Sequence, residues 1–507
     1  MKKNIIILLI SIILTTIGCT PPETIEIDTQ PVSENFIGHG VEWSAYPHGD
    51  SPDAEWGYLM TDEKLEMVYK RLDYMKPRIV RVMDVAGWRY FKGVNAKGEP
   101  ILDFDCPEVQ MVCKILDYCQ RNGIVVLLGD YGVPGFWGYP GNIDRVDDPR
   151  FIEMTTQYVS FLVKEKGFSC IKYYIITNEP NGDWACTRGE WDQWKKGVEM
   201  MAEAFANEKL DITMAAPDVV ELSNNHKSEY TGWQWVEQSV KQLDHLTGVY
   251  NVHCYADYQF IRSGAFMEHY AAVGETIRPT GKPMIFGEIG GWYHTLELGG
   301  EYKKRMQSTE FASEDSQLFV YDYLYGVDMA DMLIQTMKAG WHGASAWMLD
   351  DAMHTIGDLG DKDQLKVWGF WNSLGTELIG DPKHEEIRPW FFTWSLMSRY
   401  FTPGMKIYNP TQEESFHRLR VVAGSSGTGS TIAIVNADEV DHTFDLKMNI
   451  NGKSDLDIYD YVESGYQTDE NSFPVPVDKV TTEKVKKGFT VTIPARSFKL
   501  LTNIPIN

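Results

Sequence analysis

The feature of this sequence that most limits its possible folds is a regular alternation of short apolar runs with longer amphipathic ones. The apolar runs are rich in β-branched residues and stop at polar or turn-forming residues, which is typical of buried strands. Helical patterns separate them, such as the one that Thr61 caps with two acids, Asp62 and Glu63, in its first turn. The expected strands are Phe36–Trp43, Arg78–Asp84, Ile124–Asp130, Tyr173–Thr177, Ile212–Asp218, Val249–Asp257, Pro283–Gly290 and Gly343–Asp350.

Strands that alternate with helices form parallel sheets, and eight such units predict a closed (β/α)8 TIM barrel over residues 35–402. An open, doubly wound sheet is the alternative, and it is disfavoured because no glycine-rich phosphate-binding motif follows an early strand. Past about Thr402 the pattern changes to short alternating strands separated by Gly, Ser and Asn, which predicts a C-terminal all-β sandwich domain over residues 403–507. The alternating stretch Ile25–Ile27 can cross back to join it.

The N-terminus has the features of an export signal. Lys2 and Lys3 precede an apolar run, Ile5–Leu14, that is too short to span a bilayer. The stretch that ends in Gly18-Cys19 resembles a bacterial lipoprotein leader over residues 1–18, cut so that Cys19 carries the lipid. Thr16 stands where that pattern usually has Leu, so a plain secretory leader is the alternative. We expect an outer-membrane lipoprotein, with residues 19–34 as a tether and the lipid as its contact with the membrane.

Charge and cysteine usage narrow the possible partners. The formal net charge of −25 argues against nucleic acid and against anionic membrane surfaces, because both repel an acidic protein. Six cysteines remain beside Cys19, so an oxidising compartment permits disulfides, although buried free thiols are an equal alternative. No Cys or His pattern indicates a metal. The 16 Trp and 26 Tyr fit large cores or a sugar-binding cleft, since aromatic faces stack on sugar rings.

Two glutamates end predicted strands among small or turn-forming neighbours. Glu179, in Asn178-Glu179-Pro180, closes the fourth strand, and Glu288 closes the seventh. The carboxyl ends of barrel strands form the active face, so both carboxylates should meet across its mouth. Two carboxylates about 5 to 5.5 Å apart can cleave a glycosidic bond with retention, one protonating the leaving oxygen and the other attacking the anomeric carbon.

Asn178-Glu179-Pro180 on strand four and Glu288 on strand seven resemble the clan A glycoside hydrolases, which are retaining (β/α)8 enzymes. The segments Arg388–Trp394 and Ser398–Phe401 are similar to the last barrel helix of clan members with a C-terminal sandwich, such as families 30, 39 and 51. The resemblance implies that Glu179 is the acid/base and Glu288 the nucleophile. It also implies that Asn178 binds the sugar 2-hydroxyl, that Arg81 and Tyr255 hold the nucleophile, and that Trp347 forms the floor under the attacked sugar.

Other residues are candidates for substrate binding on weaker grounds. His253 shares a strand face with Tyr255, although it can equally be a core histidine. Trp137, Trp184 and Trp292 lie in loops on the active face and are candidate sugar platforms or loop packing. His39, Glu42 and Trp43 on the first strand are candidates for the non-reducing sugar, and Asp350 and Asp351 for substrate binding or a turn cap. The long loops 291–314 and 351–386 are expected to wall the cleft.

The sequence thus predicts an exported retaining β-glycoside hydrolase that needs no cofactor and acts on a polysaccharide or its oligosaccharides. Endo action is the first expectation, because the loops are rich in aromatic residues, and exo action is the alternative. A non-catalytic surface glycan-binding protein is a third reading, which predicts the loss of one carboxylate. We expect Glu179 to be protonated beside an apolar or like-charged neighbour, and Glu288 to be kept ionised by Arg81 and Tyr255.

Overall fold

A computed structural model describes residues 23–44, 46, 56–356, 361–412, 418–452 and 454–505. Cys19 and the predicted leader lie outside these residues. Among the described helices, none combines the length and the apolar character needed to cross a bilayer. The six cysteines beyond Cys19 are present as free thiols, so the structure favours thiols over disulfides.

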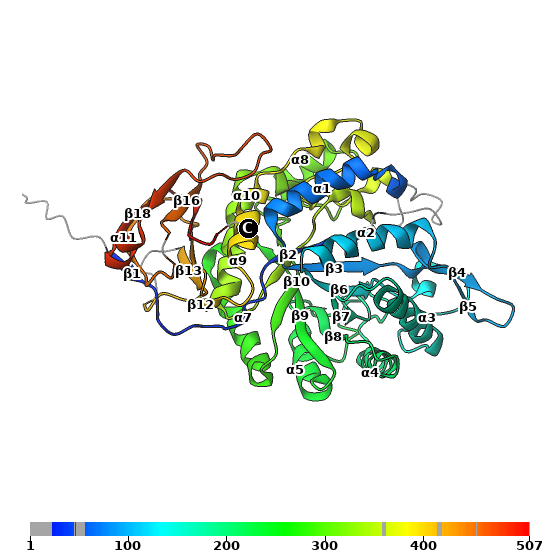
Figure 1. Cartoon of the computed structure of the whole chain (residues 1–507). Coiled ribbons are helices and arrows are strands. Elements are labelled where there is room, and N and C mark those ends of the chain that lie inside the picture. The colour runs from blue at the N-terminus through cyan, green and yellow to red at the C-terminus, as the bar shows by residue number, and fades with distance from the viewer. Residues whose placement is uncertain are drawn as a thin grey trace, which may run out of the picture.

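Eight parallel strands close into one barrel, which confirms the predicted fold (Figure 1). Each strand pairs with the next along the chain, and the eighth pairs with the first. The first strand is much shorter than predicted and spans only Gly40–Glu42. The barrel strands are β2 Gly40–Glu42, β3 Ile79–Asp84, β6 Val125–Asp130, β7 Ile171–Ile175, β8 Thr213–Val220, β9 Thr247–Asp257, β10 Met284–Trp292 and β11 Ala344–Ala346.

Helices surround the barrel and follow its strands. The N-cap predicted at Thr61 is present, since its side chain accepts from the Lys64 amide, and the first helix buries Leu65, Val68, Leu72 and Met75. A separate 3-10 turn, Leu318–Tyr321, comes just before the helix that begins at Tyr323. The helices are α1 Asp62–Met75, α2 Pro107–Arg121, α3 Pro149–Ser160, α4 Trp191–Asn207, α5 Gly232–Leu243, α6 Tyr258–Ser263, α7 Ala265–Ile277, α8 Gly299–Gln307, α9 Tyr323–Lys338 and α10 Trp390–Tyr400; a short hairpin, β4 Phe91–Val94 and β5 Pro100–Leu102, precedes α2.

The C-terminal part is a β-sandwich of two sheets, as predicted. A six-stranded sheet has the order β12-β13-β14-β19-β16-β17, and a three-stranded sheet has the order β1-β15-β18. The N-terminal strand β1 runs parallel to β15, so the chain does cross back to join the sandwich. The strands are β1 Glu23–Glu26, β12 Lys406–Tyr408, β13 Leu419–Ser425, β14 Ser430–Asn436, β15 His442–Lys447, β16 Leu456–Tyr461, β17 Asp478–Val480, β18 Phe489–Ile493 and β19 Ser497–Thr502, with a short helix α11 Thr482–Lys487.

Helix α9 joins the two parts of the molecule. It is buried from Tyr325 to Lys338, and Figure 1 shows it between the barrel and the sandwich. Two buried ion pairs fix it: Asp328 binds Arg262, with a shortest distance of 2.7 Å, and Asp331 binds Arg420 of β13 at 2.9 Å. Charges buried in pairs hold one geometry, because separating them leaves an uncompensated charge.

Strand β10 has a β-bulge at Gly287, directly before Glu288. The pairing of β10 with β9 shifts between Phe286 and Glu288, so Gly287 has no partner in the ladder. A Cβ atom at Gly287 would lie 2.6 Å from Nδ2 and 2.7 Å from Cγ of Asn251, which is fully buried. Glycine therefore allows β9 and β10 to approach closely at this point.

We predict that Gly287→Ala lowers the free energy of unfolding by about 1–3 kcal/mol, because the new methyl group overpacks Asn251. Denaturant unfolding measures this. Gly299→Ala is the matched control, since a Cβ there has no heavy atom within 4 Å, and its effect should stay within about 0.5 kcal/mol. A Gly287→Ala protein as stable as the control would contradict this account of the bulge.

Candidate active site

Glu179 lies just beyond the end of β7, at the mouth of the barrel. Its backbone adopts φ +45°, a left-handed conformation that is unusual for glutamate. Two backbone hydrogen bonds fix the turn: the Asn178 amide donates to the Asp130 carbonyl at 3.0 Å, and the Gly182 amide donates to the Glu179 carbonyl at 2.9 Å. Residues held in sparsely populated conformations cluster at functional sites. The turn thus fixes the carboxyl group at the mouth, where 9% of the residue remains exposed.

Glu288 lies on β10 and is almost completely buried. Its Oε1 accepts from Arg81 Nη1 at 2.5 Å, and its Oε2 accepts from the Tyr255 hydroxyl. Arg81 comes from β3 and Tyr255 from β9, so two other strands hold this carboxylate. Both contacts are those that the resemblance implies.

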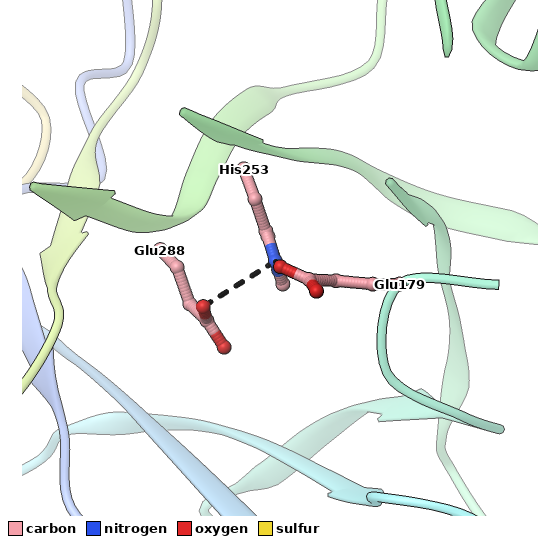
Figure 2. A group of neighbouring side chains, drawn as sticks. All are labelled: Glu179, His253 and Glu288. Atoms are coloured by element: carbon pink, nitrogen blue, oxygen red, sulfur yellow. Dashed lines mark hydrogen bonds and ion pairs between the residues drawn. The ribbon is translucent and has the colours of Figure 1, made fainter. Parts of the chain in front are cut away.

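The imidazole of His253 lies between the two glutamates (Figure 2). Its Nδ1 is 2.9 Å from Oε1 of Glu179 and 3.5 Å from Oε2 of Glu288. One side-chain atom from each of these three residues lies within 4.8 Å of the others. The structure therefore brings together the two carboxylates that the sequence places 109 residues apart and adds a histidine between them.

A third carboxylate, Asp218 on β8, lies behind this group, and sequence patterns do not single it out. Its Oδ1 accepts from His253 Nε2 at 3.0 Å, and its Oδ2 accepts from Arg81 Nη2 at 3.0 Å. The same Arg81 nitrogen donates to Oδ1 of Asn178 at 2.6 Å. The only available signal is that Asp218 ends a predicted strand, a position it shares with Glu179 and Glu288.

Burial and charge oppose each other at these groups. Burial alone lowers the pKa of His253, but the charges of Glu288 and Asp218 outweigh it and raise the pKa to about 10. Burial raises the pKa of Glu288, while His253 and Arg81 act against it. Burial likewise raises the pKa of Asp218, but Arg81 and His253 bring it below its usual value. Arg81 and Tyr255 do favour ionised Glu288 as expected, but burial is the largest effect and leaves its pKa above the usual value.

Glu179, His253 and Glu288 are close enough together to hold a metal ion, but their hydrogen bonds and charges are unsuited to one. Both oxygens of Glu288 already accept hydrogen bonds from Arg81 and Tyr255. A histidine must be neutral to bind a metal, whereas the neighbouring carboxylates of His253 favour its charged form. The donor set therefore fits an acid–base cluster better than a metal site.

Aromatic side chains extend from the two glutamates. Trp184, half exposed, donates from Nε1 to Oε2 of Glu179 at 2.6 Å. On the other side, the ring of Trp368 packs edge-on against Tyr255 at 5.4 Å and stacks on Trp292 at 5.7 Å. Trp292 ends β10, and Trp368 comes from the long loop after β11, which therefore reaches the side of the site where Tyr255 holds Glu288. Trp137 is partly exposed and packs edge-on against Phe136 in the loop after β6, with a centroid distance of 5.0 Å.

Comparison with solved structures places this fold among known ones. No family model matches the chain, and no curated protein matches it in sequence. A family 30 endoxylanase from Clostridium papyrosolvens is 13% identical with a TM-score of 0.59, and the match covers 95% of this chain and 99% of that one. A family 51 α-L-arabinofuranosidase from Bifidobacterium longum is 15% identical with a TM-score of 0.61, covering 95% and 100%. A family 39 β-xylosidase from Caulobacter crescentus is 13% identical with a TM-score of 0.58, also covering 95% and 100%.

The fold is that of clan A glycoside hydrolases. The three solved structures belong to families 30, 51 and 39, the families to which the sequence bears a resemblance. The match spans nearly all of each chain, so it includes both the barrel and the sandwich. At identities this low the comparison shows the fold, and the chemistry must be argued from the side chains.

Trp347 and Glu42 contact each other through His354, and both are buried. Trp347 follows β11 and stacks on the His354 ring at 5.1 Å. His354 Nε2 is 3.3 Å from Oε1 of Glu42, and the Tyr131 hydroxyl donates to the same oxygen at 3.5 Å. Neither His354 nor Tyr131 is recognisable from the sequence, because they come from loops with no motif.

Some predicted residues do not join the site. Trp43 is fully buried and packs edge-on against Tyr69 and Tyr118 of α1 and α2, since consecutive strand residues face opposite sides. His39 is fully buried and packs against Phe36 and Trp394, and burial lowers its pKa to about 3. A neutral core histidine explains His39 without a substrate.

Asp350 and Asp351 have structural partners instead of facing the cleft. Asp350 Oδ1 accepts from the amides of Ala352 and Ser373, and its Oδ2 accepts from the Tyr46 hydroxyl at 2.9 Å. Asp351 is paired with Arg388, ahead of α10. Both residues therefore stabilise the loop after β11. Of the two roles considered for them, this is the structural one, a turn cap, and not substrate binding.

We predict that His253 is doubly protonated at pH 8 in the folded protein, because its pKa is raised to about 10. Since the unfolded value is near 6.5, this residue stabilises the fold fully below pH 6.5 and loses that contribution as the pH rises toward 10. Imidazole ¹⁵N chemical shifts measure the protonation, with His253→Gln used for assignment. His342 is the internal reference for a neutral ring, since burial lowers its pKa. A neutral His253 at pH 8 would contradict the prediction.

Proposed function

We propose that this chain is a retaining β-glycoside hydrolase, with Glu179 as general acid/base and Glu288 as nucleophile. One observation carries the proposal: oxygens of the two carboxyl groups lie within 4.8 Å of each other at the barrel mouth. Retaining glycosidases hold their carboxyls about 5–5.5 Å apart, whereas inverting enzymes leave about 6.5–9.5 Å for a water molecule. The spacing supports retention.

In the first step, the protonated carboxyl of Glu179 gives its proton to the glycosidic oxygen while a Glu288 oxygen attacks the anomeric carbon. The bond to the leaving sugar breaks, and a glycosyl ester forms on Glu288. In the second step, Glu179 takes a proton from water, which attacks the anomeric carbon and releases Glu288 as carboxylate. The residues of this chain supply every group in the reaction, so the proposal needs no cofactor.

Arg81 and a protonated His253 contribute two positive charges to the cluster, and Asp218 and Glu288 contribute two negative ones. The proposed first step additionally requires a proton on Glu179.

We propose endo action on a β-linked polysaccharide, with Trp184 and Trp292 as sugar platforms. Trp184 touches the acid and is half exposed, so it is placed to stack on the leaving sugar. Asn178, held by Arg81, is placed to bind the sugar 2-hydroxyl, and Trp347 to lie under the attacked sugar. Trp137 is proposed to contact a sugar further along the cleft, whereas Glu42 is fully buried against Tyr131 and His354. Exo action on oligosaccharides is the alternative.

We also propose that the protein is exported and that a lipid on Cys19 anchors it to the outer membrane.

We expect Glu179→Gln to lower kcat/KM on natural glycans by about 10²- to 10⁴-fold, the usual contribution of general acid–base catalysis, and Glu288→Gln to abolish turnover. Initial rates on polysaccharides and aryl glycosides measure this. Azide should rescue Glu179→Ala on an activated aryl glycoside and give a β-glycosyl azide.

Glu221→Gln is the matched control, because Glu221 is a buried glutamate beyond β8 whose carboxyl group pairs with His269 and has no bond to the side chains of the cluster in the described structure. Its activity should equal that of the unmodified protein. Full activity in both the Glu179→Gln and the Glu288→Gln proteins would refute the mechanism. If the unmodified protein binds glycans and cleaves none of them, the hypothesis of a non-catalytic glycan-binding protein replaces that of a hydrolase.

The mode of action is read from product sizes over time. Endo action predicts a fall in polymer length with mixed internal oligosaccharides early in the reaction. Release of a single small sugar from the first time point, with the polymer length nearly unchanged, would establish the exo alternative. Trp184→Ala should raise KM for polymers more than for aryl glycosides, because the indole ring no longer stacks on the leaving sugar.

A further inference from the structure

Asp218 is a buried carboxylate whose partners are all hydrogen-bond donors. It is 1% exposed. Oδ1 accepts from His253 Nε2 at 3.0 Å and from Asn251 Nδ2 at 2.5 Å, and Oδ2 accepts from Arg81 Nη2 at 3.0 Å. Its pKa lies below the usual value, because Arg81 and His253 outweigh the effect of burial. Asp218 is therefore an anion with both oxygens in use.

The two cationic partners of Asp218 are the residues that hold the two glutamates. Through its other guanidinium nitrogen, Arg81 donates to Glu288. Through its other ring nitrogen, His253 contacts Glu179 at 2.9 Å. Asp218 is thus connected to the proposed nucleophile through Arg81 and to the proposed acid through His253.

The backbone at Asp218 is shaped for this position. The residue has φ +60°, and the pairing of β8 with β9 shifts between Pro217 and Val219. A bulge of this kind redirects one side chain out of the regular alternation of a strand. Here it directs the carboxylate between Arg81 and His253.

A purely structural role is the competing explanation, and the molecule contains an example of one. Asp331 is also fully buried and accepts from an arginine, Arg420, at 2.9 Å. Its partners join α9 to the sandwich and contact neither glutamate. Asp218 differs because each of its cationic partners makes its next contact with a catalytic carboxyl group.

We propose that Asp218 is a positioning residue that directs Nδ1–H of His253 toward Glu179 and the guanidinium of Arg81 toward Glu288. This inference rests on the proposed function. Asp218 makes no contact with either glutamate in the described structure, and it acts through the two cations. The groups that face His253 are Glu179, Asp218 and Glu288, and Glu179 is proposed to carry a proton, so removing the charge of Asp218 leaves Glu288 as the charged carboxylate that favours the imidazolium.

Asp218→Asn tests the proposal while keeping the shape of the side chain. Asparagine tolerates positive φ, so the backbone at this residue can remain as it is. An amide has one accepting and one donating end, whereas Asp218 must accept on both sides. Either orientation of the amide therefore turns its NH₂ group toward Arg81 or toward His253 and Asn251.

We expect Asp218→Asn to lower kcat on natural glycans by between about 10-fold and about 10⁴-fold, with a smaller change in KM. The upper figure is the loss seen when an amide replaces the carboxylate behind the histidine of serine proteases. In the same protein, the imidazole ¹⁵N titration of His253 should move down by about 1–3 pH units, the usual effect of one adjacent opposite charge.

Asp331→Asn is the matched control for stability. It should lose a comparable free energy of unfolding and leave both kcat and the His253 titration unchanged. If Asp218→Asn retains full kcat, or loses activity only in proportion to its folded fraction with His253 titrating as before, the proposal is overturned. If the unmodified protein cleaves no glycan, the proposed function fails instead, and the His253 titration in Asp218→Asn still decides whether Asp218 controls the histidine.

Discussion

Three carboxylates are buried at the mouth of one barrel, and two cations make this possible. Glu179, Glu288 and Asp218 would repel each other and lose their hydration if they were unpaired. Arg81 and His253 are placed between them: Arg81 contacts Asp218 and Glu288, and His253 contacts all three. Because the barrel must be closed for strands β3, β7, β8, β9 and β10 to supply these groups at one place, the site depends on the whole fold.

The exact placement of these side chains depends on departures from regular backbone geometry. Glu179 and Asp218 both have positive φ, and Glu288 follows a bulge at Gly287, where a Cβ atom would crowd the side chain of Asn251. Such conformations are unfavourable for ordinary residues and persist only where the surroundings hold them. The strong hydrogen bonds and ion pairs of the cluster provide that constraint, so the strained backbone and the buried charges stabilise each other.

Local sequence patterns predicted the number of strands, their order and the two glutamates, because alternation and strand-end polar residues are local signals. The resemblance to the clan, and not a local pattern, implied the contacts of Arg81 and Tyr255 with Glu288. Local patterns did not identify Asp218, since nothing in Ala-Pro-Asp distinguishes a redirected side chain from the end of a strand. His354 and Trp368 were missed because loop geometry decides their positions. Trp43 was placed near the cleft although it follows Glu42 directly, and the alternation of strand faces puts it among the helices instead.

The aromatic side chains connect the cluster to the loops that surround it. Tyr255 donates to Glu288 and packs against Trp368, which in turn stacks on Trp292. Trp368 also donates from Nε1 to the Asp315 carbonyl at 2.7 Å, which ties its loop to the preceding one. A sugar stacked on Trp292 would therefore press on the same row of rings that holds the hydroxyl of Tyr255 against Glu288. Under the proposed function, substrate binding at Trp292 and support of Glu288 would therefore share one set of contacts.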